Sequence, residues 1–305
     1  MATSRITVAV CTLNRSKQLK TCLDAILKQT LPSSDYEVLV VDNGSTDDTK
    51  DLTEALGKKH ANLRYFHEPV MGLSRARNTA LAQTTTPYIA YLDDDAIPYA
   101  NWLEELVQPF SLDLRPAVVG GDLEPIWETP RPEWLVDDFL HQYSVCLCWD
   151  TQPRPISGKE WLCEANIAFD VEALTAAGGF DEALGRRGSL LLSGENFVNE
   201  IIRENGGCLY YTPLARAWHL IPKNRITLDW IRQRYFWGGV TKSVIMYELE
   251  RRFGAVTPWK DLVLPSSCSD WAAVLNPIAD AGLPEQIMWL LNLGWLLHRK
   301  GFIAA

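Results

Sequence analysis

The stretch PYIAYLDDDAIP, residues 87–98, joins a short apolar run directly to three adjacent aspartates. The apolar run, Tyr88 to Leu92, is typical of a buried strand. Adjacent carboxylates repel one another, and at the end of a buried strand they cannot spread apart as they could along a helix. They therefore form either a solvated acidic turn or a site for Mg²⁺ or Mn²⁺, ions that take carboxylate ligands and complete their shell with phosphate oxygens.

Strand patterns alternate with helix patterns through the first 120 residues. Apolar runs predict strands at 6–11, 37–41 and 62–66, and apolar residues at helical spacing predict helices at 16–29, 47–56 and 74–83. Repeated strand–helix units with short connections imply an α/β fold, in which helices cover both faces of a parallel sheet. Ligands of such sheets bind beyond the carboxyl ends of the strands, where the three aspartates are expected.

A second polar turn follows the strand at 37–41, in the sequence VVDNGSTD, residues 40–47. Asp42 can accept hydrogen bonds from a nucleobase or a ribose, although alone the motif is only a turn with a helix cap. Thr12 to Arg15, Asp42 and Asp93 to Asp95 would all project from one sheet edge, which predicts a nucleotide-diphosphate site. No GxxxxGK[ST] or GxGxxG motif occurs, so metal would hold the phosphates in place of a glycine-rich loop.

The chain changes in texture after residue 120. Residues 122–162 are rich in Pro and Trp without clean periodicity, which is typical of a lid, an acceptor-facing insertion or a plain irregular connection. Helical patterns return at 171–177 and at 195–205, where Gly206 and Gly207 end the second helix before a strand, CLYYT. After Pro222 the patterns are helical, with a tail helix at 284–299, so we expect a C-terminal helical extension over 223–305.

Composition limits the partners and the location of the protein. A formal net charge of -9 argues against nucleic acid, which is bound through clustered Lys and Arg. The seven cysteines show no metal-binding spacing and are expected to be reduced thiols in a cytoplasmic protein. The N-terminal apolar stretch is too short for a signal peptide. The apolar tract 287–297 is about half of the roughly 20 residues that span a membrane, but it suits peripheral contact with the inner membrane face.

Eight sequence pieces, taken together and in order, resemble glycosyltransferase family 2. The pieces are VAVCTLNR, the helix ending in LKQT, EVLVVDNGSTDDT, GLSRARNTAL, YIAYLDDDAIP, ANIAF, GGFDEAL, and GEN followed by ENGG. The resemblance implies a GT-A-like fold over residues 1–222, with a Rossmann-like, mostly parallel central sheet flanked by helices. Its nucleotide-sugar half would span about 1–120 and its acceptor and catalytic half about 121–222. The implied activity is inverting transfer of a sugar from a nucleotide-diphosphate sugar to a sugar or lipid-linked acceptor, in polysaccharide or glycolipid assembly.

The resemblance also assigns residues to the site. It implies a nucleotide-sugar cleft formed by Thr12, Arg15, Asp42, Arg77, Asp93 and Asp94, and a Mg²⁺ or Mn²⁺ ion held by Asp95 and His219. Asp42 would contact the base, and Asp94 would lie near the ribose or the diphosphate. For His219, beside Trp218, a packed core histidine is the alternative to a metal ligand.

The catalytic base motif departs from the family pattern. The family usually places Glu-Asp at the start of the later helix, with Asp as the base, whereas this chain has Gly194-Glu195-Asn196. An amide cannot take a proton at neutral pH, so the resemblance places the base at Glu195. The departure leaves a catalytically weak nucleotide-sugar binding protein as one alternative. A nucleotidylyltransferase is the other, but it would be expected to carry a glycine-rich, basic N-terminal loop.

Overall fold

The computed structural model describes residues 5–145, 149–157, 160–187, 190–191, 195–254 and 282–303. The chain divides into two compact units. The first, here called the sheet unit, comprises Met1–Glu182 and Glu195–Ile221. The second, here called the helical unit, comprises Ala183–Gly194 and Pro222–Ala305.

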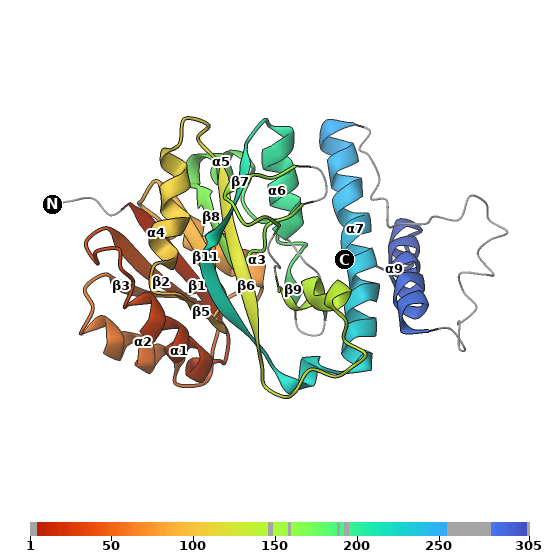
Figure 1. Cartoon of the computed structure of the whole chain (residues 1–305), viewed down its shortest axis with the longest axis horizontal. Helices are drawn as coiled ribbons and strands as arrows, with labels where there is room; N and C mark the ends of the chain where they lie inside the picture. The colour runs from red at the N-terminus through yellow and green to blue at the C-terminus, as the bar shows by residue number, and fades with distance from the viewer. Residues whose placement is uncertain are drawn as a thin grey trace. The chain divides into compact units, whose positions relative to one another are not determined.

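The sheet unit begins with the predicted alternation of strands and helices (Figure 1). Its first elements are β1 Ile6–Thr12, α1 Ser16–Ile26, β2 Tyr36–Asp42, α2 Thr49–Gly57, β3 Leu63–His67, α3 Leu73–Gln83 and β4 Tyr88–Leu92. There follow β5 Ala96–Pro98, α4 Trp102–Val107, η1 Gln108–Ser111, β6 Val118–Trp127, η2 Asp137–Tyr143, β7 Arg154–Pro155, β8 Asn166–Asp170, α5 Val171–Ala176, α6 Glu195–Glu204 and β11 Leu209–Ile221. The α/β fold class is therefore confirmed.

One sheet carries the strands in the order β3-β2-β1-β4-β8-β6-β11-β5, and β7 pairs with β11. The first four strands in this order are mutually parallel, so their carboxyl ends meet at one edge. Strand β8 runs antiparallel to β4 and β6, β11 is parallel to β6, and β5 is antiparallel to β11. The turns after β1, β2 and β4, which hold the predicted site residues, therefore gather at this edge.

The apolar runs of the sequence form the core between the sheet and its helices. Ile6, Val8 and Val10 of β1 pack with the apolar stripe of α1, which buries Leu19 and Leu23. Tyr91 points to the opposite face, because successive side chains of a strand alternate. Its hydroxyl donates to a backbone carbonyl of α3, 2.9 Å away, and α3 contacts β1 and β2 from that face. Helices thus cover both faces of the parallel part of the sheet.

Residues 122–162 contain more regular structure than their sequence predicts. The strand β6 runs through Gly120, Gly121 and Pro125, residue types that are depleted in strands. Gly121 is required because β6 and β11 approach closely where their register shifts: a Cβ at Gly121 would lie 1.8 Å from the carbonyl oxygen of Ala215. The local pattern cannot show this, since it depends on a strand about 90 residues further along the chain.

The helical unit contains two packed helices, α7 Leu228–Phe253 and α9 Leu283–Arg299, which confirm the predicted C-terminal helices. It also holds η3 Lys223–Arg225 and a two-stranded pair, β9 Arg186–Arg187 with β10 Leu190–Leu191. The Thr227 side chain caps α7 by accepting from the backbone N–H of Trp230 at 3.2 Å. Among the described residues, no helix is long and apolar enough to cross a membrane.

Glycines set the close contact between α7 and α9. A Cβ at Gly239 would lie 1.9 Å from the carbonyl oxygen of Leu291, and a Cβ at Gly294 would lie 2.1 Å from that of Phe236. Both obstructing atoms belong to helix backbone, which cannot rotate away as a side chain can. Neighbouring Gly238 is different, because its Cβ would meet only a Leu291 side-chain carbon at 3.6 Å.

We expect Gly239→Ala to destabilise the protein by about 1–3 kcal/mol, because the two helices must separate to admit a methyl group. Gly238→Ala is the matched control, and it should be neutral or stabilise by up to about 1 kcal/mol, since alanine favours a helix interior. Thermal denaturation followed by circular dichroism compares the two variants. A Gly239→Ala protein that melts at the wild-type temperature would contradict the close packing.

Candidate metal and nucleotide site

The three adjacent aspartates form the turn between β4 and β5, and the pairing of β5 with β11 brings His219 to them. Strand register sets Ala96 opposite His219, and the N–H of Leu220 donates to the carbonyl oxygen of Asp95 at 3.0 Å. A residue about 120 positions away in sequence is thereby fixed beside the acidic turn.

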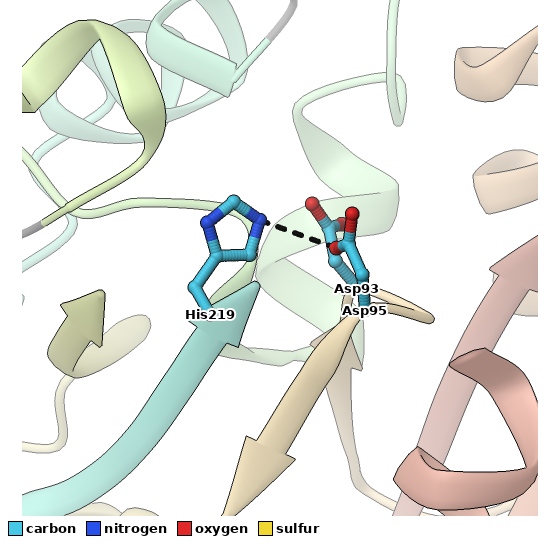
Figure 2. Close-up of side chains that lie close together, drawn as sticks. All are labelled: Asp93, Asp95 and His219. Carbon is cyan, nitrogen blue, oxygen red and sulfur yellow. Dashed lines mark ion pairs between the residues drawn. The ribbon is translucent and has the colours of Figure 1, made fainter. Parts of the chain in front are cut away.

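Asp93, Asp95 and His219 converge in a cluster that suits a divalent cation (Figure 2). Each offers one ligand atom, and these atoms lie within 4.8 Å of one another. The Nε2 atom of His219 lies 3.2 Å from Oδ1 of Asp95, and both side chains are buried. Two carboxylates held this close favour a cation, and carboxylate oxygen with imidazole nitrogen is a donor set that accepts Mn²⁺ or Mg²⁺. The residues present therefore fit the ion that the sequence predicts.

Asp94, the middle aspartate of the turn, contacts Thr12 and Arg15. It is 5% exposed and accepts hydrogen bonds from Thr12 Oγ1 at 2.7 Å and from Arg15 Nη1 at 2.9 Å. The same Arg15 nitrogen lies 2.9 Å from Oδ2 of Asp95. Burial raises the pKa of Asp94 to about 6, with Arg15 acting to lower it and Asp95 to raise it further. Arg15 thus offsets the negative charge of two carboxylates.

Arg77 contacts Asp93, the first aspartate of the turn. It is 5% exposed, and its Nη2 lies 3.4 Å from Oδ1 of Asp93. Its Nη1 contacts Glu164, a carboxylate that is 2% exposed and directly precedes the ANIAF piece. Sequence reasoning missed Glu164, yet a charged residue inside the apolar run of residues 162–169 was the available signal, because a buried charge needs a partner.

Asp42 is held within the second polar turn. Its Oδ1 accepts from the N–H of Ser45 at 2.8 Å, and its Oδ2 accepts from the hydroxyl of Tyr65 at 2.8 Å. Burial and this bond to a carboxylate both raise the pKa of Tyr65. The sequence did not indicate Tyr65, which becomes a neighbour only through the β2–β3 register that pairs it with Val40.

Comparison with known proteins gives the family. The sequence model described as Glycosyl transferase family 2 matches residues 7–153. The chain therefore contains a glycosyltransferase family 2 domain. It is 38% identical to Glycosyltransferase AglE of Haloferax volcanii over 123 residues, which is 39% of each chain. It is 24% identical over 285 residues to the Glucosyl-dolichyl phosphate glucuronosyltransferase of the same organism, covering 90% of this chain and 83% of the relative.

A solved structure supports the GT-A fold of this family 2 glycosyltransferase. The mannosyltransferase of Pyrobaculum calidifontis in complex with GDP-Man and Mn²⁺ aligns with a TM-score of 0.66 at 20% identity, covering 99% of this chain and 88% of that protein. At this identity the likeness concerns the fold. The GT-A fold and the family that the sequence resembles are therefore confirmed.

In this family 2 glycosyltransferase, most of the predicted site residues come together at one sheet edge, and the predicted base is described only in part. Arg15 joins Asp94 to Asp95, and Arg77 contacts Asp93, which lies in the metal cluster. Glu195 is the first residue of α6, but its side chain and Gly194 lie outside the described residues. Its role as base stays a prediction.

Proposed function

We propose that this family 2 glycosyltransferase moves a sugar from a nucleotide-diphosphate sugar to an acceptor hydroxyl, with inversion at the anomeric carbon and with Mg²⁺ or Mn²⁺. The convergence of Asp93, Asp95 and His219 at the carboxyl edge of the parallel strands carries the proposal. Carboxylates at that edge repel a diphosphate unless a cation lies between them. When bound there, a divalent cation supplies charge neutralisation for the departing nucleotide diphosphate.

The other residues of the edge suit the nucleotide. Arg15, whose side chain is 36% exposed, carries a guanidinium that a phosphate can reach, and Thr12 holds Asp94 beside it. Bonds to the Ser45 N–H and the Tyr65 hydroxyl hold the carboxylate of Asp42 in a fixed orientation, and we assign Asp42 to the nucleobase or ribose. Glu195 is our candidate for the general base that takes the proton of the acceptor hydroxyl.

Differential scanning fluorimetry with UDP- and GDP-sugars, each with and without Mn²⁺, tests the donor class. A bound donor raises the melting temperature, because it stabilises only the folded state. The amount of sugar released or transferred is then compared with that of a heat-inactivated control. An excess over this control identifies an enzyme and excludes a mere binding protein. Stabilisation without turnover would favour the binding protein, and joining of a nucleotide to a sugar phosphate would favour the nucleotidylyltransferase.

We assign the acceptor to sugars or lipid-linked sugars, and we place the protein at the inner face of the membrane. The relative named Glucosyl-dolichyl phosphate glucuronosyltransferase acts, by its name, on a lipid-linked sugar. Within the helical unit, Phe302 is 74% exposed directly after Lys300 and Gly301 at the end of α9. An exposed aromatic residue beside a cation suits contact with anionic lipid.

We expect the protein to co-sediment with vesicles of anionic phospholipid and to bind neutral phosphatidylcholine vesicles less. Phe302→Ser should lower the bound fraction, because it removes apolar surface that would enter the lipid. Equal sedimentation of the wild type with and without anionic vesicles would contradict the proposed membrane contact. It would not bear on the proposed sugar transfer.

A further inference from the structure

The guanidinium of Arg77 is enclosed between two carboxylates. One is Glu164, just before β8, and the other is Asp93, at the end of β4. The ring of Phe180 lies 5.6 Å from the guanidinium carbon. The side chains of Arg77 and Glu164 are 6% and 2% exposed, while that of Asp93 is 34% exposed. Arg77 therefore joins a wholly buried acid to one that opens toward the metal cluster.

The two contacts differ in strength. Glu164 makes the closer contact with Arg77, and Asp93 lies at the outer limit of a hydrogen bond, 3.4 Å from Nη2. A fully buried carboxylate also attracts the guanidinium more strongly than a partly solvated one, since less water screens the charges. The guanidinium of Arg77 is therefore held mainly by Glu164, and the carboxylate of Asp93 stays available to another cation.

We propose that Glu164 is a positioning residue for the metal site. Acting through Arg77, it holds the guanidinium close enough to orient Asp93 and too far to neutralise it. The inference rests on the proposed function, because it assumes that Asp93 faces a divalent cation. Without the charge of Glu164, the guanidinium moves onto Asp93 and competes with that cation.

A purely structural role would give a different result. If Glu164 served only to neutralise a buried arginine, its loss would lower stability and leave the metal affinity of the folded protein unchanged. If Glu164 acts through Arg77, its effect on the metal affinity must vanish once Arg77 is replaced. A double-mutant cycle measures this dependence directly.

The cycle uses Glu164→Gln, Arg77→Gln and the double variant, with Mn²⁺ alone as the probe. Calorimetric titration gives the Mn²⁺ affinity, and circular dichroism confirms folding. We expect Glu164→Gln to weaken Mn²⁺ binding about tenfold, as outer residues of metal sites do. In the Arg77→Gln background the same change should alter the affinity by less than about twofold.

Glu37→Gln is the matched control. Glu37, on β2, accepts a hydrogen bond from Thr7 at 2.7 Å and pairs with Arg64 at 3.1 Å, near the amino ends of the parallel strands. This change removes an acid from an arginine pair at the other end of the strands, so it should leave the Mn²⁺ affinity unchanged. If Glu164→Gln does not fold, Glu164→Asp repeats the cycle, because its shorter side chain moves the carboxylate away from the guanidinium and so weakens their attraction.

Two results would overturn the inference: an unchanged Mn²⁺ affinity in folded Glu164→Gln, or an equal loss in both Arg77 backgrounds. A wild-type protein that binds no Mn²⁺, with or without a nucleoside diphosphate, would instead overturn the proposed metal site. The two failures are therefore distinguishable.

Discussion

Changing Asp95 to asparagine is expected to remove the metal-dependent binding of a nucleoside diphosphate while the protein stays folded. Asp95 is central to the cluster, since its Oδ1 faces His219 and its Oδ2 contacts Arg15. Substitution of outer residues already lowers metal affinity by about 10–100-fold, so loss of a ligand should cost at least about 100-fold. Asparagine keeps the shape of a side chain that is only 5% exposed, and it removes one of three repelling charges.

Calorimetric titration with UDP and with GDP, in Mn²⁺ and in EDTA, measures this effect. Asp24→Asn is the control, because the Asp24 side chain on α1 is 41% exposed and pairs only with Lys20 among the described contacts. The wild type and the control should lose affinity on addition of EDTA, whereas Asp95→Asn should bind weakly in both conditions. Affinity of the wild type that is equal with and without EDTA would refute the metal assignment.

The parallel half of the sheet could be predicted because each of its elements has a complete local signal. The strands β1, β2 and β4 are continuous apolar runs, as expected for strands buried on both faces. The structure moves their boundaries by only a residue or two. The mixed half was predicted poorly, since β6 contains two glycines and a proline, and β5 has only three residues.

The site shows the same division between local and distant information. Asp42 and Asp93 to Asp95 could be found because each ends a recognisable strand. Tyr65 could not, because its partner is set by strand register. For Glu164 the local sequence shows a charge within an apolar run, but not its partner Arg77, which the packing of α3 sets. His219 is intermediate: the family resemblance located it, and the β5–β11 pairing explains physically why it reaches Asp95.

Changing Glu195 to glutamine is expected to lower turnover by about two to four orders of magnitude while donor affinity hardly changes. The substitution keeps the size of the side chain and removes its ability to accept a proton. Three points support Glu195 as the base. It is the first residue of α6, where the positive end of the helix dipole keeps a carboxylate ionised. It is the sole ionisable group in the motif Gly194-Glu195-Asn196, and the resemblance to family 2 implies that the base lies at this position.

Steady-state kinetics with the donor identified by fluorimetry, together with calorimetric donor affinity, separate the two effects. Glu204→Gln is the matched control, because Glu204 is an exposed glutamate at the other end of the same helix. It should leave both turnover and donor affinity at the wild-type level.

A Glu195→Gln protein with wild-type turnover would exclude Glu195 and move the search to Asp181 and Glu182 in the GGFDEAL piece. Of these two, Glu182 already pairs with Arg75 at 3.1 Å, so its carboxylate is engaged within the protein. Asp181→Asn would then be the first variant to measure. A loss of turnover in Glu195→Gln with an equal loss of donor affinity would also argue against a base, because a group that acts only in proton transfer leaves ground-state binding intact.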